Sequence, residues 1–408
     1  MSFKNPLMYT FLSVALVLLS LRALSRWRPV LLAVFNVVFV ALVLEVSWSS
    51  LATLGGFLLF HYGVLRLMLV AERSNHRRAL FWGWIVLGLA GFVVVKQYWW
   101  ITDLVVSRER LSLALNVAGL SFIFFRQLCL SIEVRDGAVG EVPVLDYFNY
   151  NLAYWSFIAG PLQRYEAFRE QSARLVAGEP VPAVSALRGL NRAMLGFLKM
   201  FVVGPWVSAY ATPSTFLDRP DVLHLVLFLV AFPIYLYINF SGYCDIVNGL
   251  AKAVGFVLPE NFNHPYRSRS INDFWSRWHI SLSELLRDYL FFPMQTALSR
   301  RLPLLPSMAV AALVSFCIMG AWHGNCFGFV VFGLLHGLGV VATNLYTGVL
   351  KRVLSKEGVR RYRRSLAVKV VAVALCQAYV VLTFLPFKYG AGELSQVLGA
   401  VRGMLGKS

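Results

Sequence analysis

The chain has 408 residues, of which 58% are hydrophobic and only 14% are charged, and its mean hydropathy is +0.65. This composition supplies too little polar surface to cover a water-soluble globule of this size. It therefore excludes a soluble protein and predicts one that lies in a lipid bilayer.

The net charge of +18 arises from 38 basic and 20 acidic residues. In a soluble protein such an excess would indicate nucleic acid binding, but here Lys and Arg gather in short connectors between apolar runs. We therefore expect no nucleic acid partner and interpret the basic clusters at residues 22–28, 73–78 and 352–364 as cytoplasmic loops. This predicts a multi-pass protein of the cytoplasmic (inner) membrane with its N-terminus outside the cytoplasm.

A membrane-spanning helix needs ~20 predominantly apolar residues. The chain shows no fixed-period repeat and no similar halves, so we predict one domain over residues 1–408. We expect this domain to be all-α, a polytopic transmembrane helical bundle of about 10–11 spans with re-entrant or interfacial helices. The first run is read as a retained helix because no small-residue cleavage site follows it. The apolar runs begin near Leu7, Val30, Leu51, Leu80, Leu111, Tyr147, Leu187, Val222, Leu305, Phe327 and Val368.

Two polar stretches interrupt these runs, a connector at residues 160–192 and a patterned stretch at residues 261–301. In the second, Ser270 and Asp273 form a variant of the capping box and Pro293 is the next strong breaker, which predicts one helix of ~20 residues. Trp275, Trp278 and His279 would share a face of that helix. Its many charged residues exclude a lipid-facing position, so it must lie at the interface or around a wet cavity.

Two further apolar runs between residues 304 and 350 meet at the segment GAWHGNCFG. Basic residues flank both outer ends, so both ends should face the cytoplasm and the chain must turn at the junction. We expect Gly320, Gly324 and Gly328 to give the backbone freedom for this break. The turn holds His323 away from the cytoplasmic surface, where functional use is the default hypothesis and a hydrogen-bonded structural histidine is the alternative.

The remaining histidines favour structural interpretations. His336 is expected to pack under a close helix approach at Gly333 and Gly337. The others look ordinary, two of them near span ends (His61 and His224) and two elsewhere (His76 and His264).

Four segments resemble the signature blocks of the membrane-bound O-acyltransferase (MBOAT) family, in the family's order. The two longest exceed anything that apolar composition produces by chance. The segments are AGPLQRYEAF (159–168), FSGYCDIVNGLAKAVGF (240–256), ENFNHPYRSRSINDFWSRWHISLSELLRDYL (260–290) and GAWHGNCFGFVVFGLLHG (320–337).

Within that family the chain resembles the bacterial DltB/AlgI-like branch, whose members acylate cell-envelope polymers. The fragment LSIEVRDG and the short length look more like the teichoic acid D-alanylation proteins, whereas GYCDIVNGL and NFNHPY look more like the alginate acetylases. The acyl group, D-alanyl or acetyl, therefore stays open.

The resemblance implies a ring of helices around a central funnel, a catalytic core at residues 261–350, and catalytic roles for His323 and His279. We predict that His323 is the general base that deprotonates the acceptor hydroxyl. His279 would orient the acceptor or donate a hydrogen bond to the developing oxyanion. The predicted substrate-binding residues are Trp278, Trp322, Arg277, Ser281, Asn263 and Arg287.

Arg277 and Arg287 also have a structural alternative to substrate binding, since each can pair with a carboxylate along the helix. Without a GxSxG elbow we predict direct transfer and no covalent acyl-serine at Ser281. We expect no bound cofactor and no metal. The resemblance implies a cytoplasmic donor, which is an acyl carrier protein phosphopantetheine thioester or an acetyl-CoA-derived group.

The family resemblance further implies an extracytoplasmic acceptor polymer, such as teichoic acid, polysaccharide or peptidoglycan. In some members it also implies a partner acyltransferase outside the membrane. A membrane transporter or channel for a small polar solute is the main alternative, because buried polar helices and glycine breaks also build substrate pathways. A metal or haem site at His279, His323 and His336 is disfavoured because no carboxylate lies beside the WHG turn and the cysteines show no CxxC spacing.

Overall fold

The computed structural model describes residues 11, 14–15, 18–19, 21–44, 47–71, 74–96, 119–324 and 326–406. These residues form helices and no β-strand, and the β-bridge between Phe262 and Trp278 is isolated. The predicted all-α class is confirmed. The chain divides into two compact units, Met1–Leu195 with Cys244–Pro259, and Gly196–Tyr243 with Glu260–Ser408.

Six helices among the described residues are long and apolar enough to cross a membrane, which confirms a multi-pass membrane protein. Five of the predicted runs match them directly, and the run near Val30 lies in the first. They are Ala23–Val43, Trp48–Val70, Val222–Ala253, Leu304–His323, Phe327–Val353 and Leu366–Lys388.

The other predicted runs are not among these six helices. Residues 111–118, at the start of the run near Leu111, lie outside the described residues, and the part that follows forms the 16-residue helix α7, which is not among the six. Of the run near Leu7, only residues 11, 14–15 and 18–19 are described. The run near Tyr147 was wrong as a span, because it forms the nine-residue helix α8 (Val144–Leu152), which is far too short to cross a bilayer. The runs near Leu80 and Leu187 form helices of 23 and 16 residues that are not among the six.

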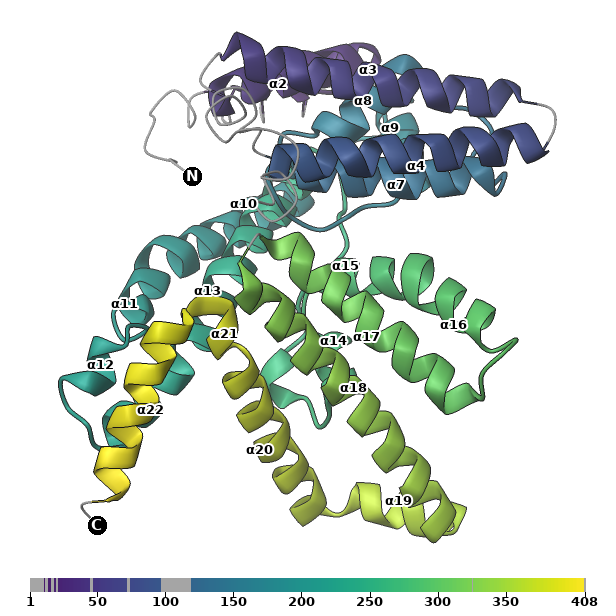
Figure 1. Cartoon of the computed structure of the whole chain (residues 1–408). Helices are drawn as coiled ribbons and strands as arrows, with labels where there is room; N and C mark the ends of the chain where they lie inside the picture. Colours follow the sequence, from purple (N-terminus) through teal and green to yellow (C-terminus); the bar gives the residue numbers. More distant parts are fainter. Residues whose placement is uncertain are drawn as a thin grey trace. The chain divides into compact units, whose positions relative to one another are not determined.

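The first unit packs α3 against α4 and α7, and α2 against α8. Ser47 begins α3 by accepting a hydrogen bond from the Ser50 amide at 3.4 Å, a normal N-cap. Figure 1 shows α2, α3, α4 and α7 as the long helices of this unit. Its helices are η1 (Arg22–Trp27), α2 (Arg28–Val43), α3 (Trp48–Val70), α4 (Ser74–Lys96), α7 (Leu120–Arg135), α8, α9 (Tyr165–Val176) and most of α10 (Ala183–Leu198).

His61 lies in the middle of α3 and is fully buried, so its expected position near a span end was wrong. Its Nδ1 is 2.9 Å from the Tyr147 hydroxyl and its Nε2 is 2.8 Å from Ser131 Oγ. Tyr147 donates its proton to the Leu58 carbonyl at 2.9 Å. Both ring nitrogens therefore have partners, as a structural histidine requires.

The second unit contains the remaining helices and the part of α13 that precedes Cys244. Figure 1 shows α17 and α18 as an antiparallel pair in this unit. The helices are η2 (Lys199–Val203), α11 (Gly204–Ser208), α12 (Ser214–Leu217), α13 (Val222–Ala253), η3 (Pro265–Arg267), α14 (Ile271–Trp275), α15 (Ile280–Leu286), η4 (Arg287–Phe291), α16 (Phe292–Leu298), α17 (Leu304–His323), α18 (Phe327–Val353), α19 (Lys356–Arg364), α20 (Leu366–Thr383), α21 (Leu385–Lys388) and α22 (Ala391–Leu405).

The predicted hairpin of residues 304–350 is confirmed as α17 and α18, but its glycines act differently from the expectation. None of Gly320, Gly324 and Gly328 adopts a left-handed backbone, and Gly324 ends α17 with an extended backbone (φ 169°). A Cβ at Gly320 would collide with the Phe329 carbonyl, and one at Gly333 would collide with the Phe316 carbonyl. These glycines therefore let the two helices approach closely rather than freeing the backbone.

The single helix predicted after Ser270 was also wrong. Ser270 does cap α14, since its hydroxyl accepts from the Asp273 amide at 3.1 Å, but α14 ends after one turn at Trp275. A turn and the bridge at Trp278 follow, α15 begins at Ile280, and Pro293 lies in the first turn of α16 rather than ending a helix. Trp275, Trp278 and His279 consequently do not share one helical face.

Candidate functional site

His323 is the last residue of α17 and lies half-buried at the apex of the hairpin. Aromatic rings surround its imidazole. The ring centroids of Trp322 and Phe387 lie 4.8 and 5.1 Å from it, and those of Phe329 and Phe332 each lie 6.1 Å away. The hairpin and α21 thus enclose the imidazole in an apolar wall.

His279 lies in the break between α14 and α15 with a left-handed backbone (φ 44°). The turn is fixed on both sides, because the Ile280 amide donates to the Asn261 carbonyl at 3.0 Å and Trp278 pairs with Phe262. A non-glycine residue in this region is uncommon and carries strain that the surrounding structure must balance. The strained turn directs the His279 ring into the interior, where it is only 4% exposed.

The Nδ1 atom of His279 is buried and has no hydrogen-bond partner among the described residues. Its ring packs edge-on against Phe240, with centroids 4.8 Å apart. Burial, and to a lesser extent the charge of His323, lowers the pKa of His279 to about 3. His279 is therefore neutral at physiological pH, with one ring nitrogen available to a ligand.

The fold brings the two predicted catalytic residues within electrostatic range of each other, although His279 and His323 are 44 positions apart in the sequence. Phe332 and Phe384 continue the aromatic packing from His323 to Trp278, the residue before His279. The catalytic roles themselves stay predictions.

Of the predicted substrate-binding residues, the two tryptophans pack among aromatic rings, and Arg277 and Asn263 contact each other. Trp322 packs on His323, and Trp278 is buried between Phe274 and Phe262. Arg277 pairs with Asp273 at 2.6 Å and donates to the Asn263 carbonyl at 3.3 Å, and the first of these contacts is the one that the structural alternative expects. The Arg277 and Asn263 contacts thus hold the turn before His279.

Ser281 also supports this turn. Its hydroxyl donates to Asn261 Oδ1 at 2.7 Å, and its amide donates to the same oxygen at 3.2 Å. Asn261 therefore ties the start of α15 to the segment before η3. Sequence reasoning missed Asn261, although it lies in the quoted block at residues 260–290.

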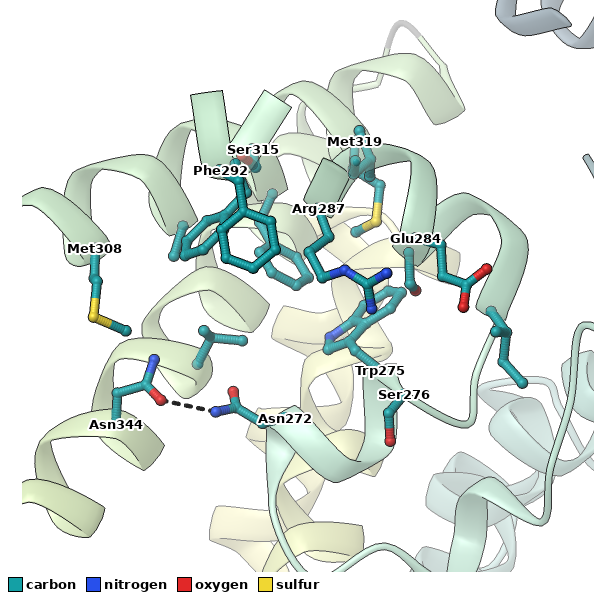
Figure 2. Close-up of a pocket in the computed structure, with 17 residues that line it drawn as sticks. Asn272, Trp275, Ser276, Glu284, Arg287, Phe292, Met308, Ser315, Met319 and Asn344 are labelled. Carbon is teal, nitrogen blue, oxygen red and sulfur yellow. Dashed lines mark hydrogen bonds between the residues drawn. The ribbon is translucent and has the colours of Figure 1, made fainter. Parts of the chain in front are cut away.

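Arg287 lines a pocket of about 410 Å³ between α14–α16 and the hairpin. Figure 2 shows its guanidinium directed into this pocket beside Trp275 and Met319. Its Nε donates to Asp288 at 2.9 Å, and its terminal nitrogens make no hydrogen bond with the residues that the structure describes. The terminal nitrogens of Arg287 are therefore donors that can meet a ligand in this pocket.

The wall of this pocket follows one face of α17 from Met308 to Met319. At 1.5 Å per residue this is ~16 Å, and His323 follows Met319 by one further turn on the same face. Ser315 is 4% exposed and its hydroxyl, on the same wall, has no hydrogen-bond partner among the described residues. Sequence reasoning missed Ser315 because nothing marks it within an apolar run.

Asn272 and Asn344 stand at the other end of the pocket, where Asn272 Nδ2 donates to Asn344 Oδ1 at 2.8 Å (Figure 2). The pocket therefore has an amide pair at one end, an apolar wall, and a cation with a buried hydroxyl farther in. Its volume is typical of sites for small ligands.

His336 is structural, as predicted. Its Nδ1 accepts from Trp275 Nε1 at 3.2 Å, so its Nε2 carries the proton and donates to Thr383 Oγ1 at 3.0 Å. The ring is fully buried beneath the close approach of Gly333 and Gly337 to α17. Within the described ranges, no three His, Cys, Asp or Glu side chains gather into a group able to hold a metal ion.

The model of the family "MBOAT, membrane-bound O-acyltransferase family" matches residues 84–385, about three quarters of the chain. The chain belongs to the membrane-bound O-acyltransferase family. It is therefore a polytopic membrane acyltransferase, and the matched region contains both histidines, the pocket and the hairpin.

Two kinds of relative are found within this family. A teichoic acid D-alanyltransferase of Bacillus subtilis is 27% identical over 67% of this chain and 70% of its own length. One of Lacticaseibacillus rhamnosus is 26% identical over 86% and 88%. The probable alginate O-acetylase AlgI of Pseudomonas aeruginosa is 29% identical over 82% of this chain and 64% of its own length. The resemblance to the DltB/AlgI-like branch is thereby confirmed.

Proposed function

We propose that this MBOAT protein transfers a short acyl group, D-alanyl or acetyl, from a cytoplasmic thioester donor to hydroxyl groups of an extracytoplasmic envelope polymer. The observation that carries the proposal is that His279, whose buried Nδ1 has no partner among the described residues, lies within electrostatic range of His323, which follows the pocket residue Met319 by about one turn of α17. The named relatives act on teichoic acid and alginate, which supports an envelope polymer as acceptor.

His323 acts as the general base. The acceptor hydroxyl gives its proton to the imidazole as its oxygen attacks the acyl carbonyl carbon, which forms a tetrahedral oxyanion. The oxyanion collapses to the new ester and expels the donor thiolate, which takes the proton back from His323. The enzyme thus returns to its starting state, and no acyl group is attached to the protein.

His279 stabilises the oxyanion. Because its ring is neutral, it has one N–H, and the unpartnered Nδ1 can direct that N–H at the developing negative charge. Burial makes such a hydrogen bond stronger than it would be in water. Ser281 supports His279 through Asn261 rather than taking the acyl group.

The pocket along α17 receives the donor. An acyl carrier protein phosphopantetheine thioester or an acetyl-CoA-derived group carries amides and phosphate, which match the buried Ser315 hydroxyl and the Arg287 guanidinium. Trp322 and Trp278 complete the aromatic wall near the reacting atoms. No bound cofactor takes part.

The flanking charges support a position in the cytoplasmic (inner) membrane with the N-terminus outside, and with the basic ends of α17 and α18 in the cytoplasm. The donor carrier docks on that side. We include in the proposal a separate extracytoplasmic acyltransferase as a partner, because the family resemblance implies one.

The test uses cells that lack the gene and are complemented with variants of the full chain. D-Alanine and acetate released from the envelope by mild alkali are quantified, since both are ester-linked. His323→Ala should reduce the released acyl group to the level of the deletion strain. The matched control is His76→Ala, which removes an exposed histidine of α4 and should leave the amount unchanged.

The identity of the released acid decides the acyl group. If His323→Ala retains the wild-type amount of ester at equal protein level, the base assignment is wrong. If the deletion strain loses neither D-alanine nor acetate esters, the acceptor or the acyl class is wrong.

A further inference from the structure

A second, smaller groove lies between α17 and α18, close to their basic ends. It has a volume of about 240 Å³ and its walls are apolar except for Asn344. The residues that line it are Leu305, Pro306, Met308, Ala309, Val341, Asn344 and Leu345.

The register of the hairpin places both walls at one depth. Gly337 packs on Leu313 and Gly333 packs on Phe316, so the same antiparallel register sets Leu305 opposite Leu345. Both helices cross the membrane, so the groove opens at the level of lipid chains.

Four exposed cations stand just beyond the groove. Arg300 and Arg301 precede α17, and Lys351 and Arg352 are in the last turn of α18. None of the four forms an ion pair with a residue that the structure describes. The groove is thus capped by positive charge on the side where lipid phosphates lie.

The helix α19 adds to this charge. Its basic residues include Arg360, Arg361, Arg363 and Arg364, all exposed. The hydroxyls of Tyr346 and Tyr362 lie 2.6 Å apart and attach α19 to α18 one residue beyond Leu345. A cluster of this size beside membrane spans attracts anionic lipid headgroups.

We propose that this groove binds an anionic phospholipid of the leaflet on the basic side, with one acyl chain between α17 and α18 and its phosphate on the four cations. A soluble acidic protein would use the cations but not the apolar groove, so the combination favours a lipid. The groove shares Met308 and Asn344 with the larger pocket, so the bound chain contacts the wall of that pocket.

The proposal is tested by native mass spectrometry of the detergent-purified full chain titrated with phosphatidylglycerol or phosphatidylcholine. One phosphatidylglycerol should be retained in preference to phosphatidylcholine. The double variant Arg301→Gln/Lys351→Gln should weaken this binding roughly 30-fold, from the contribution expected of two interfacial cations. Arg402→Gln, which removes an exposed cation of α22, is the matched control.

A second variant tests the groove itself. Ala309→Trp fills the groove and should abolish preferential retention, whereas Leu375→Trp on the exposed face of α20 should not. Glycerol 3-phosphate, which has the phosphate and no chains, should not compete. Equal retention of the two lipids by the wild type, unchanged binding in both the charge and the groove variants, or competition by glycerol 3-phosphate would overturn the proposal.

Discussion

Two buried histidines of the second unit differ in what surrounds their ring nitrogens. His336 has a partner at each nitrogen, whereas the buried Nδ1 of His279 has none among the described residues. A buried polar atom without a partner costs about 1–3 kcal/mol, and this cost supports the role proposed for His279. The distinction could not be read from the sequence, where both histidines simply lie in quoted blocks.

Substitution of His279 should separate activity from stability. Asparagine tolerates the left-handed backbone at this position, so His279→Asn should keep the turn but reduce acyl transfer by about 10²–10³-fold, as for loss of an oxyanion donor. His279→Ala should lose both activity and some stability. The amount of envelope ester measures activity and thermal unfolding in detergent measures stability, so the two effects can be told apart. Wild-type activity of His279→Asn would contradict the oxyanion role of His279.

The same residue predicts a pH dependence of stability. The folded pKa of about 3 lies below the ordinary value of 6.5, so the stabilisation from a neutral His279 is complete above pH 6.5 and is lost as the pH falls toward 3. Its slope reaches at most ~1.4 kcal/mol per pH unit. Unfolding of His279→Asn should depend less steeply on pH across this window, and parallel curves for the two proteins would rule the prediction out.

Substitution of His336, unlike that of His279, should lower stability and leave activity unchanged. His336→Ala removes the acceptor of Trp275 Nε1 deep in the unit and should lower the free energy of unfolding by about 1–3 kcal/mol. Because the ring does not touch the reacting atoms, the activity per folded molecule should stay near the wild-type value. Urea or thermal unfolding, with activity normalised to folded protein, checks this.

At the scale of elements, the hairpin α17–α18 depends on glycine contacts. Gly333→Ala places a Cβ against the Phe316 carbonyl and should force the helices apart at a cost of about 1–3 kcal/mol. Gly348→Ala in the same helix is the matched control, since open space surrounds that position and alanine favours helix. Equal melting temperatures for the two variants would show that the close approach contributes nothing to stability.

The broken segment at residues 271–298 shows where local patterns fail. The Ser270 cap was predicted and is present, but the helix that it begins ends at Trp275. The pairing of Trp278 with Phe262 and the hydrogen bond from Ile280 to Asn261 hold the break. These partners are 16 and 19 residues away, so no window of local sequence reveals them.

At the scale of the whole molecule, the charge pattern predicts that the hairpin apex faces away from the cytoplasm. Cys326 is exposed at this apex, whereas Cys129, Cys244 and Cys376 are buried. A membrane-impermeant maleimide should therefore label Cys326 in intact cells, and Cys326→Ser should abolish that label. A cysteine introduced at exposed Ser355 should react only after permeabilisation, and the reverse pattern would invert the predicted orientation.

The sequence by itself determined the membrane location, the all-α class, the hairpin and the choice of His279 and His323 as candidates. Hydropathy and flanking charge carry the first three, and the short segments that resemble the family carry the last. Only the tertiary structure decided that Arg277 is held by Asp273, that Arg287 and Ser315 face a pocket, and that His279 lies within electrostatic range of His323. It also replaced the predicted long helix around His279 with a strained turn. The physical reason is that burial and partner choice depend on residues brought together from distant parts of the chain, so the site around His323 exists only once the helices have packed.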